Sequence, residues 1–157
     1  MDLLKPAHMV APTLIGCYLK VNDTIVQITE VEAYEDDEAS HAFKRTPRSE
    51  IMYDTVGHVY VYLIYGMHYC LNITTTTGKP GAVLIRGARH VSGPIQRTDL
   101  NGPGKLCQAL GVTKEWNNTV LGDKIELIEK PRLPSTATPR IGIRHAQHLL
   151  WRWIINK

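Results

Sequence analysis

The chain has 157 residues and a formal net charge of +3, a length that predicts one domain, residues 1–157. Its 43% hydrophobic and 21% charged residues exclude a disordered chain, and the mild positive charge fits either an ordinary basic surface or a nucleic-acid partner. No apolar stretch approaches the roughly 20 residues that span a bilayer, and residues 1–19 do not resemble a secretory signal, so we expect an intracellular protein without a membrane partner.

Strand patterns dominate the middle of the chain. Residues 25–34 alternate, which predicts a strand with Val26, Ile28, Glu30, Glu32 and Tyr34 on one face. Residues 58–65 are β-branched and aromatic, and Gly66 then permits a turn, so residues 68–75 are expected to return as the second strand of a hairpin. Two further short strands are predicted over residues 82–86 and 124–128.

Helices are fewer. A short helix is expected within residues 9–19, and another over residues 104–111, after Pro103 and ending in a glycine. Residues 145–153 fit a helix or a final strand equally well. Loops are predicted over residues 74–81, 91–104 and 130–139, which are rich in Gly, Pro or polar residues. The predicted class is α+β with a largely antiparallel sheet.

The cysteines and histidines do not form a recognisable metal site. Cys17, Cys70 and Cys107 are odd in number and lack a CxxC pair, which argues against a disulfide framework and a zinc cage. His145 and His148 have i,i+3 spacing but no third ligand at a recognisable spacing. Because Walker A, GxGxxG and GxSxG motifs are also missing from the sequence, we expect neither a metal nor a cofactor.

Glu30 and Glu32 are unusual because glutamate is disfavoured inside strands. On a half-buried face a carboxylate needs partners or a function, and burial raises its pKa towards values that suit a general base. The alternative is that the strand end is exposed and both glutamates are solvated. The pattern alone does not choose between these readings, nor between the two residues.

Tyrosines and cations gather near the predicted hairpin. Tyr60 and Tyr62 share a strand face, and Tyr65 reaches the turn, where an aromatic side chain is suited to wedge between DNA bases. Residues 44–48, Lys-Arg-Thr-Pro-Arg, are suited to contact phosphates. The alternatives are tyrosines that pack a core and a solvated basic loop.

Two polar residues, Asn72 and Arg86, lie on predicted strands after the hairpin turn. A run of acidic residues lies before the hairpin. Asn72 is on the returning hairpin strand, and Arg86, at the end of an apolar run, is expected to pair with a carboxylate, with Glu32 as the candidate and a remote structural ion pair as the alternative. Residues 35–38, Glu-Asp-Asp-Glu, would repel phosphate, so we expect them to point away from DNA or to form a loop wall.

Ordered motifs along nearly the whole chain resemble the alkyladenine (3-methyladenine) DNA glycosylase family. They are Thr-Glu-Val-Glu-Ala-Tyr (29–34), Ala-Ser-His (39–41), Thr-Pro-Arg (46–48), Tyr-Val-Tyr (60–62), Tyr-Gly-Met-His-Tyr-Cys-Leu-Asn (65–72), Val-Leu-Ile-Arg (83–86), Gly-Pro-Gly-Lys-Leu-Cys-Gln-Ala-Leu (102–110), Pro-Arg-Ile-Gly-Ile (139–143) and Trp-Arg-Trp (151–153). The resemblance implies a single-domain monomer with a curved antiparallel sheet, a protruding hairpin and a few flanking helices. It implies a monofunctional enzyme, without metal or cofactor, that flips alkylated or deaminated purines out of double-stranded DNA and hydrolyses the N-glycosidic bond.

The resemblance also implies a role for individual residues. Glu32 matches the base that activates water, Arg86 helps to hold that water, and the main chain at Ile141 completes its site. The flipped purine would contact Tyr34, His41 and Tyr62, and Asn72 would reject guanine by a clash with its exocyclic amine. Tyr65 matches the wedge, Met52 a residue that supports the intrusion, and Arg45, Arg48 and Lys105 are the expected contacts to the DNA backbone.

Two other functions would fit parts of this pattern. A non-catalytic module that binds lesions would not need a carboxylate at position 32. A hydrolase of free nucleosides would not need a wedge at position 65 or basic loops. Assays with lesion-bearing duplexes and free nucleosides separate these alternatives.

Overall fold

The computed structural model describes residues 1–64, 68–76 and 78–157. Within these ranges, three α-helices, α1 (Ala7–Leu14), α2 (Glu50–Asp54) and α3 (Pro103–Leu110), accompany two single 3₁₀ turns, η1 (His41–Phe43) and η2 (Lys114–Trp116). The strands are β1 (Tyr18–Val21), β2 (Thr24–Tyr34), β3 (Val59–Ile64), β4 (His68–Thr74), β5 (Ala82–Ser92), β6 (Ile125–Ile128), β7 (Ser135–Thr138) and β8 (Arg152–Ile155). These elements confirm the predicted α+β class.

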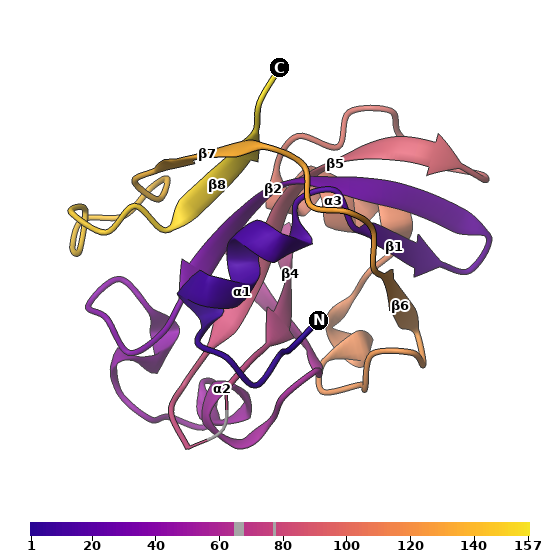
Figure 1. Ribbon diagram of the computed structural model, residues 1–157. Helices are drawn as coiled ribbons and strands as arrows, with labels where there is room; N and C mark the ends of the chain where they lie inside the picture. The colour runs from indigo at the N-terminus through magenta and orange to yellow at the C-terminus, as the bar shows by residue number, and fades with distance from the viewer. Residues whose placement is uncertain (65–67, 77) are drawn as a thin grey trace.

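The strands form one curled antiparallel sheet with β2 near its centre (Figure 1). The main path runs β3-β4-β5-β2-β1-β6, and β3 and β4 pair as the predicted hairpin. One edge of β2 pairs with β5, and the other pairs first with β1 and then with β8, which also pairs with β7. The end of β2 therefore lies between strands from the middle and from the end of the chain.

An irregularity between β2 and β5 corrects the predicted face of Glu30, Glu32 and Tyr34. The register shifts between Ile28 and Glu30 and again between Glu30 and Val31. Core residues occupy even positions before the shifts, at 26 and 28, but odd positions after them, at 31 and 33. Such bulges re-aim the side chains that follow, so the glutamates and Tyr34 face away from the core residues of their own strand.

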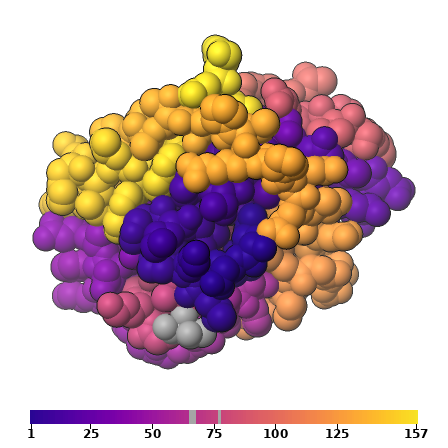
Figure 2. Space-filling model, in the orientation of Figure 1, coloured from indigo at the N-terminus to yellow at the C-terminus, as the bar shows by residue number. Residues whose placement is uncertain are grey.

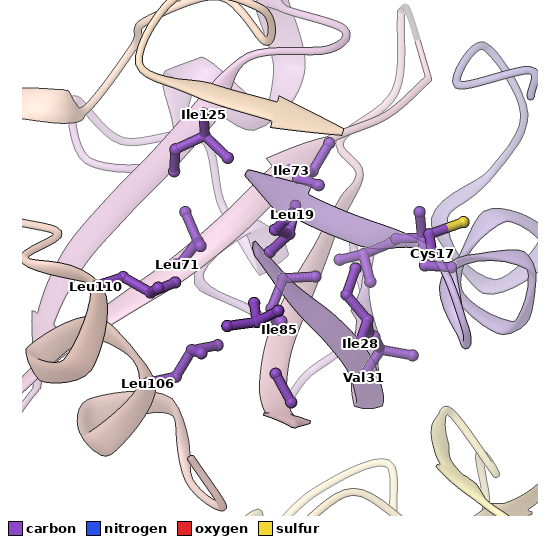
Figure 3. Close-up of a cluster of buried hydrophobic side chains, with 14 of the residues drawn as sticks. Cys17, Leu19, Ile28, Val31, Leu71, Ile73, Ile85, Leu106, Leu110 and Ile125 are labelled. Atoms are coloured by element: carbon purple, nitrogen blue, oxygen red, sulfur yellow. The ribbon is translucent and has the colours of Figure 1, made fainter. Parts of the chain in front are cut away.

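The hydrophobic core packs between the sheet and its helices (Figure 3). Helix α1 packs on β2 and β5, and helix α3 on β4 and β5. The core side chains that Figure 3 labels are Cys17, Leu19, Ile28, Val31, Leu71, Ile73, Ile85, Leu106, Leu110 and Ile125. A smaller cluster of Ala42, Met52, Tyr60 and Ala82 lies apart from this core and supports a different region of the sheet.

Several elements differ from the sequence expectation. The predicted helix over residues 9–19 begins earlier and ends at Leu14, because Gly16, at a φ of +100°, turns the chain into the unpredicted strand β1. Strand β5 continues six residues beyond Arg86, to Ser92. Strand β7 lies inside the loop predicted for residues 130–139, because pairing with β8 stabilises it. Residues 145–153 form neither a complete helix nor a complete strand: only their end joins β8.

The start of the chain lies against its last third. Figure 2 shows the first residues bordered by residues from the C-terminal third, and the N-terminal ammonium pairs with Glu129. The ring of His8 in α1 stacks on Trp151 at 5.2 Å. Among residues 1–64, 68–76 and 78–157, no helix combines the length and apolar character that crossing a membrane requires.

Candidate active site

A cavity of about 510 Å³ opens where β2, β3, β4 and β5 converge. Its walls also include η1, the first turn of α3 and residues 141–143. Tyr34, Tyr60 and Tyr62 contribute aromatic surface, and His41 and Asn72 contribute polar groups. An apolar, aromatic cavity with a few polar groups, in the size range of about 300–1,000 Å³, is typical of a small-molecule pocket.

Glu32 is fully buried directly behind the wall of this pocket. Its Oε1 accepts a hydrogen bond from the Tyr34 hydroxyl at 2.8 Å, and its Oε2 accepts one from the Ile141 main-chain N–H at 2.7 Å. Burial raises the pKa of Glu32, and the charge of Arg86 and these two hydrogen bonds oppose that rise. The carboxyl group of Glu32 therefore holds a proton more strongly than a solvated glutamate does. It is surrounded by three residues that line the pocket, Tyr34, Arg86 and Ile141.

Arg86 bridges both glutamates, which refines the predicted pairing. Its Nε donates to Glu30 Oε2 at 3.3 Å, whereas its Nη1 lies 3.7 Å from Glu32 Oε1. Arg152 of β8 also donates to Glu30 Oε2, at 2.5 Å. Glu30 thus holds two arginines, and the guanidinium of Arg86 remains beside both Glu32 and the pocket.

The aromatic wall is closely packed. The rings of His41 and Tyr62 meet edge-on at 4.5 Å, and those of Tyr60 and Tyr62 lie 5.2 Å apart. Burial, assisted by the charge of Arg48, lowers the pKa of His41 to about 4. His41 is therefore neutral at neutral pH and can both donate and accept a hydrogen bond. Burial raises the pKa of Tyr34, Tyr60 and Tyr62, which keeps their hydroxyls protonated.

Asn72 and Met52 form deeper parts of the wall. Asn72 is buried and its side-chain nitrogen donates to the Tyr60 carbonyl at 3.2 Å, which fixes the orientation of the amide. Met52 is only 2% exposed and packs in the cluster that includes Tyr60. A side chain this buried supports the pocket wall, so any help that Met52 gives to an intrusion into DNA must be indirect.

The three expected phosphate contacts have different surroundings. Arg45 pairs with Asp54 at 2.6 Å and Lys105 with Asp99 at 2.8 Å, and all four side chains are about half exposed. The guanidinium of Arg48 lies 5.2 Å from the centre of the Tyr62 ring, beside the pocket. Only Lys105 of the three lines the pocket itself, in the first turn of α3. Tyr65, the predicted wedge, lies outside the described residues.

An ion pair that the sequence patterns did not reveal lies beside Glu32. Arg140 is 4% exposed and forms two hydrogen bonds with Asp37, at 2.6 and 3.1 Å. Neither residue belongs to a periodic element, so only the motif block over residues 139–143 indicated this region. Tyr60 and Cys70 also line the pocket, and the i,i+2 spacing of Tyr60 and Tyr62 already predicted their shared face.

No group of three or more His, Cys, Asp or Glu side chains is placed to hold a metal ion within the described parts of the chain. His145, one of the two histidines considered above, instead lies 3.6 Å from Glu38.

The fold and pocket define an α+β domain with a buried carboxylate behind an aromatic cavity, an arrangement suited to an enzyme that acts on a flat ring. The family model for methylpurine-DNA glycosylase (MPG) matches residues 1–157. The chain is 43% identical to a protein of Rickettsia felis over 97% of this chain and 89% of that one, and 42% identical to one of Ehrlichia chaffeensis over 93% and 86%. It is also 43% identical to a Wolbachia protein from Brugia malayi over 96% and 92%. All three relatives are named, provisionally, as 3-methyladenine DNA glycosylases.

The chain belongs to the methylpurine-DNA glycosylase family. It is a monofunctional DNA glycosylase for alkylated purines, a hydrolase of N-glycosyl bonds that acts in DNA repair. This membership confirms the resemblance and supports an enzyme over a non-catalytic module, and DNA over free nucleosides as the substrate.

Proposed function

We propose that Glu32 is the general base that activates the attacking water. The observation that carries this proposal is a fully buried carboxylate held on both oxygens beside the pocket. Each carboxylate oxygen has two acceptor positions, so the bonds from Tyr34 and Ile141 leave one on each oxygen for a water. Arg86 lies near enough to Glu32 to orient that water from the pocket side.

The chemistry follows from charge. Alkylation at N3 or N7 makes the purine cationic and a better leaving group. The bond from C1′ to the base breaks with its electron pair passing to the base, and an oxocarbenium-like sugar forms. Glu32, as the carboxylate, stabilises that cation and accepts a proton from water as the oxygen bonds to C1′. General-base help of this kind contributes about 10²–10⁴-fold to the rate.

The pocket is suited to hold a purine flipped out of the duplex. Flipping costs a few kcal/mol, and least for damaged or mispaired bases. Tyr34, His41 and Tyr62 would contact the flipped purine, and aromatic faces favour a cationic ring. The fixed amide of Asn72 would clash with the exocyclic amine of normal guanine. 7-Methylguanine carries the same amine, so its excision would depend on its cationic ring, which the aromatic faces favour and which is the better leaving group. Hypoxanthine, ethenoadenine, 3-methyladenine and 7-methylguanine are the proposed substrates.

The remaining roles concern the duplex. Tyr65 would fill the space left by the flipped base, with Met52 as indirect support. Arg45, Arg48 and Lys105 would contact phosphates. We expect the enzyme to act as a monomer, inside the cell, and at the nucleoid if the cell is bacterial.

The decisive experiment is excision by Glu32→Gln. We expect this variant to release no base from duplexes carrying the four lesions, while its affinity for the same duplexes persists, because only the proton acceptor changes. Abasic-site formation and duplex binding are measured in parallel with the unaltered protein. Full excision by Glu32→Gln would refute the role of Glu32, and release from free nucleosides alone would refute the role of the duplex.

A further inference from the structure

Arg140 is anchored in a site built for a guanidinium. Besides its two bonds to Asp37, its Nη1 donates to the Ala33 carbonyl at 3.0 Å, one residue after Glu32. Its guanidinium carbon lies 4.8 Å from the centre of the Tyr34 ring and 5.3 Å from that of Trp151. The side chain is fully buried and that of Asp37 is 10% exposed. This site joins β2, the acidic loop and the end of the chain.

Both hydrogen-bond donors on Glu32 lie next to this arginine. The first donor is Tyr34. Its ring packs against the guanidinium of Arg140, and its hydroxyl donates to Glu32 Oε1. The second, the N–H of Ile141, belongs to the next residue along the chain and bonds to Glu32 Oε2. Ile141 is 48% exposed, so the packing of its side chain does little to hold this segment.

Three members of the acidic run over residues 35–38 pair with basic side chains, at different degrees of exposure. Glu35 accepts from the main chain and ring of His8, at 3.0 and 2.6 Å, and Asp37 accepts from Arg140. Glu38 lies 3.6 Å from His145, where both side chains are more than 60% exposed. Glu35 and Asp37 therefore both have partners within the protein, and Asp37 is the one that holds Arg140.

We infer that Arg140, held by Asp37, is a positioning residue that keeps the Tyr34 hydroxyl and the Ile141 amide on the carboxylate of Glu32. This inference deepens the proposed function and rests on Glu32 as the base. We call the Arg140–Asp37 pair the clamp. Loss of the clamp would release the segment that carries Ile141, and Glu32 would lose the hydrogen bond from the Ile141 amide. A displacement of about 1 Å near reacting groups lowers rates by about 10²-fold.

The clamp also affects how Glu32 titrates. Glu32 faces Tyr34 and Glu30 from β2, Cys70 from β4 and Arg86 from β5, and Arg152 of β8 reaches it through Glu30. The Ile141 amide is one of the groups that lower the pKa of Glu32. Without that bond the pKa of Glu32 rises further. As the pH is lowered, the base then becomes protonated, and excision falls, at a higher pH than in the unaltered protein.

The test is single-turnover excision from a duplex carrying a methylated purine, measured against pH. Arg140→Lys keeps the charge but loses the two-pronged bond to Asp37. We expect its maximal rate to fall by about 10²-fold, its duplex affinity to persist, and the acidic limb of its pH profile to move to higher pH. Glu38→Gln, in the adjacent exposed pair, is the matched control and should retain the original profile.

Nuclear magnetic resonance of the unaltered protein provides a test that does not depend on the variant folding. In the unaltered protein, the chemical shift of the Ile141 amide proton should change with pH with the same apparent pKa as the acidic limb of excision. In Arg140→Lys, the same proton should lose the chemical shift that is typical of a hydrogen-bonded amide. An Ile141 amide that does not titrate, or an Arg140→Lys profile with an unmoved limb, would overturn the inference. Because Glu32→Gln tests the base directly, an inactive Glu32→Gln together with either result would separate failure of this inference from failure of the proposed function.

Discussion

At the scale of single residues, the notable feature is a carboxyl group placed where its charge is disfavoured. Glu32 is 0% exposed, and burial outweighs Arg86 and two hydrogen bonds in setting the direction of its pKa. Catalytic groups are often held in such environments because a raised pKa makes a carboxylate a better proton acceptor. The same environment makes the ionised residue a source of instability.

Glu32→Gln should therefore gain stability relative to the unaltered protein as pH rises. Because the folded-state pKa of Glu32 is raised, its favourable contribution is fully present below the unfolded pKa of about 4.3 and is lost as pH rises through the folded value. Urea unfolding at pH 4 and pH 8 measures the free energy of unfolding of both proteins. The difference in favour of the variant should be larger at pH 8.

Glu38→Gln, an exposed neighbour, is the control for this measurement and should show a smaller dependence on pH. A Glu32→Gln advantage that shrinks as pH rises would contradict a raised pKa.

At the scale of elements, the bulge between β2 and β5 decides which side chains reach the pocket. Arg86 and Glu30 lie at the register shifts, and Gly87 pairs with Glu30 across them. A Cβ at Gly87 would lie 3.3 Å from Glu30 Cβ and 3.3 Å from Thr29 Oγ1, a close contact that leaves little space for a side chain. The glycine therefore lets the two strands approach where both glutamates emerge.

Gly87→Ala should lower excision by displacing Glu30, which holds Arg86 beside Glu32. We expect the fold to be retained with a loss of about 1–3 kcal/mol, as is usual for overpacking. Single-turnover excision and thermal unfolding measure the two effects. Glu30→Gln weakens the same pairing without adding volume, so it should also lower excision. Excision at the original rate in Gly87→Ala would show that the bulge tolerates a side chain.

How far the sequence predicted each element depended on whether its cause was local. Alternation predicted β2, β-branched and aromatic residues predicted the hairpin strands, and Pro103 with Gly111 predicted α3, because those signals lie within or next to the element. Strand β7, four residues between prolines, has no such signal and depends on pairing with β8. The bulge that turns Glu32 away from the face of Ile28 depends on β5, more than fifty residues away in the sequence.

The candidate site shows the same division. The motifs selected Glu32, Arg86 and the aromatic wall, and the structure brings those side chains together. Arg140 was missed because its partner Asp37 is 103 positions away and neither lies in a periodic segment. The shorter contact of Arg86 with Glu30 depends on the register between strands, which a single sequence does not specify.

At the scale of the whole molecule, much of the positive charge proposed to bind DNA is already neutralised by acidic side chains of the protein. The net charge is +3, and two of the three proposed phosphate contacts, Arg45 and Lys105, already pair with aspartates. An exposed ion pair contributes little to stability, so either cation can exchange its aspartate for a phosphate at small cost. Affinity for undamaged duplex should therefore be modest.

Duplex binding should weaken only gently with salt. With three phosphate contacts, the slope of log K against log salt concentration should be about −3, since each contact contributes about 0.9. Titrations of an undamaged duplex over a range of salt concentrations measure this slope. Asp99→Asn, which releases Lys105, should strengthen binding at low salt. A much steeper slope would mean that further cations contact the backbone.

The site is joined across almost the whole chain, and this has a consequence for folding. Glu32 and Ile141 are 109 positions apart, and Glu30 and Arg152 are 122 apart. Contacts between such distant segments form slowly, because the intervening chain must first lose its conformational freedom. A refolding molecule can thus complete its local hairpin well before Ile141 reaches Glu32. Catalytic competence would be among the last properties the protein regains, after most of its secondary structure has formed.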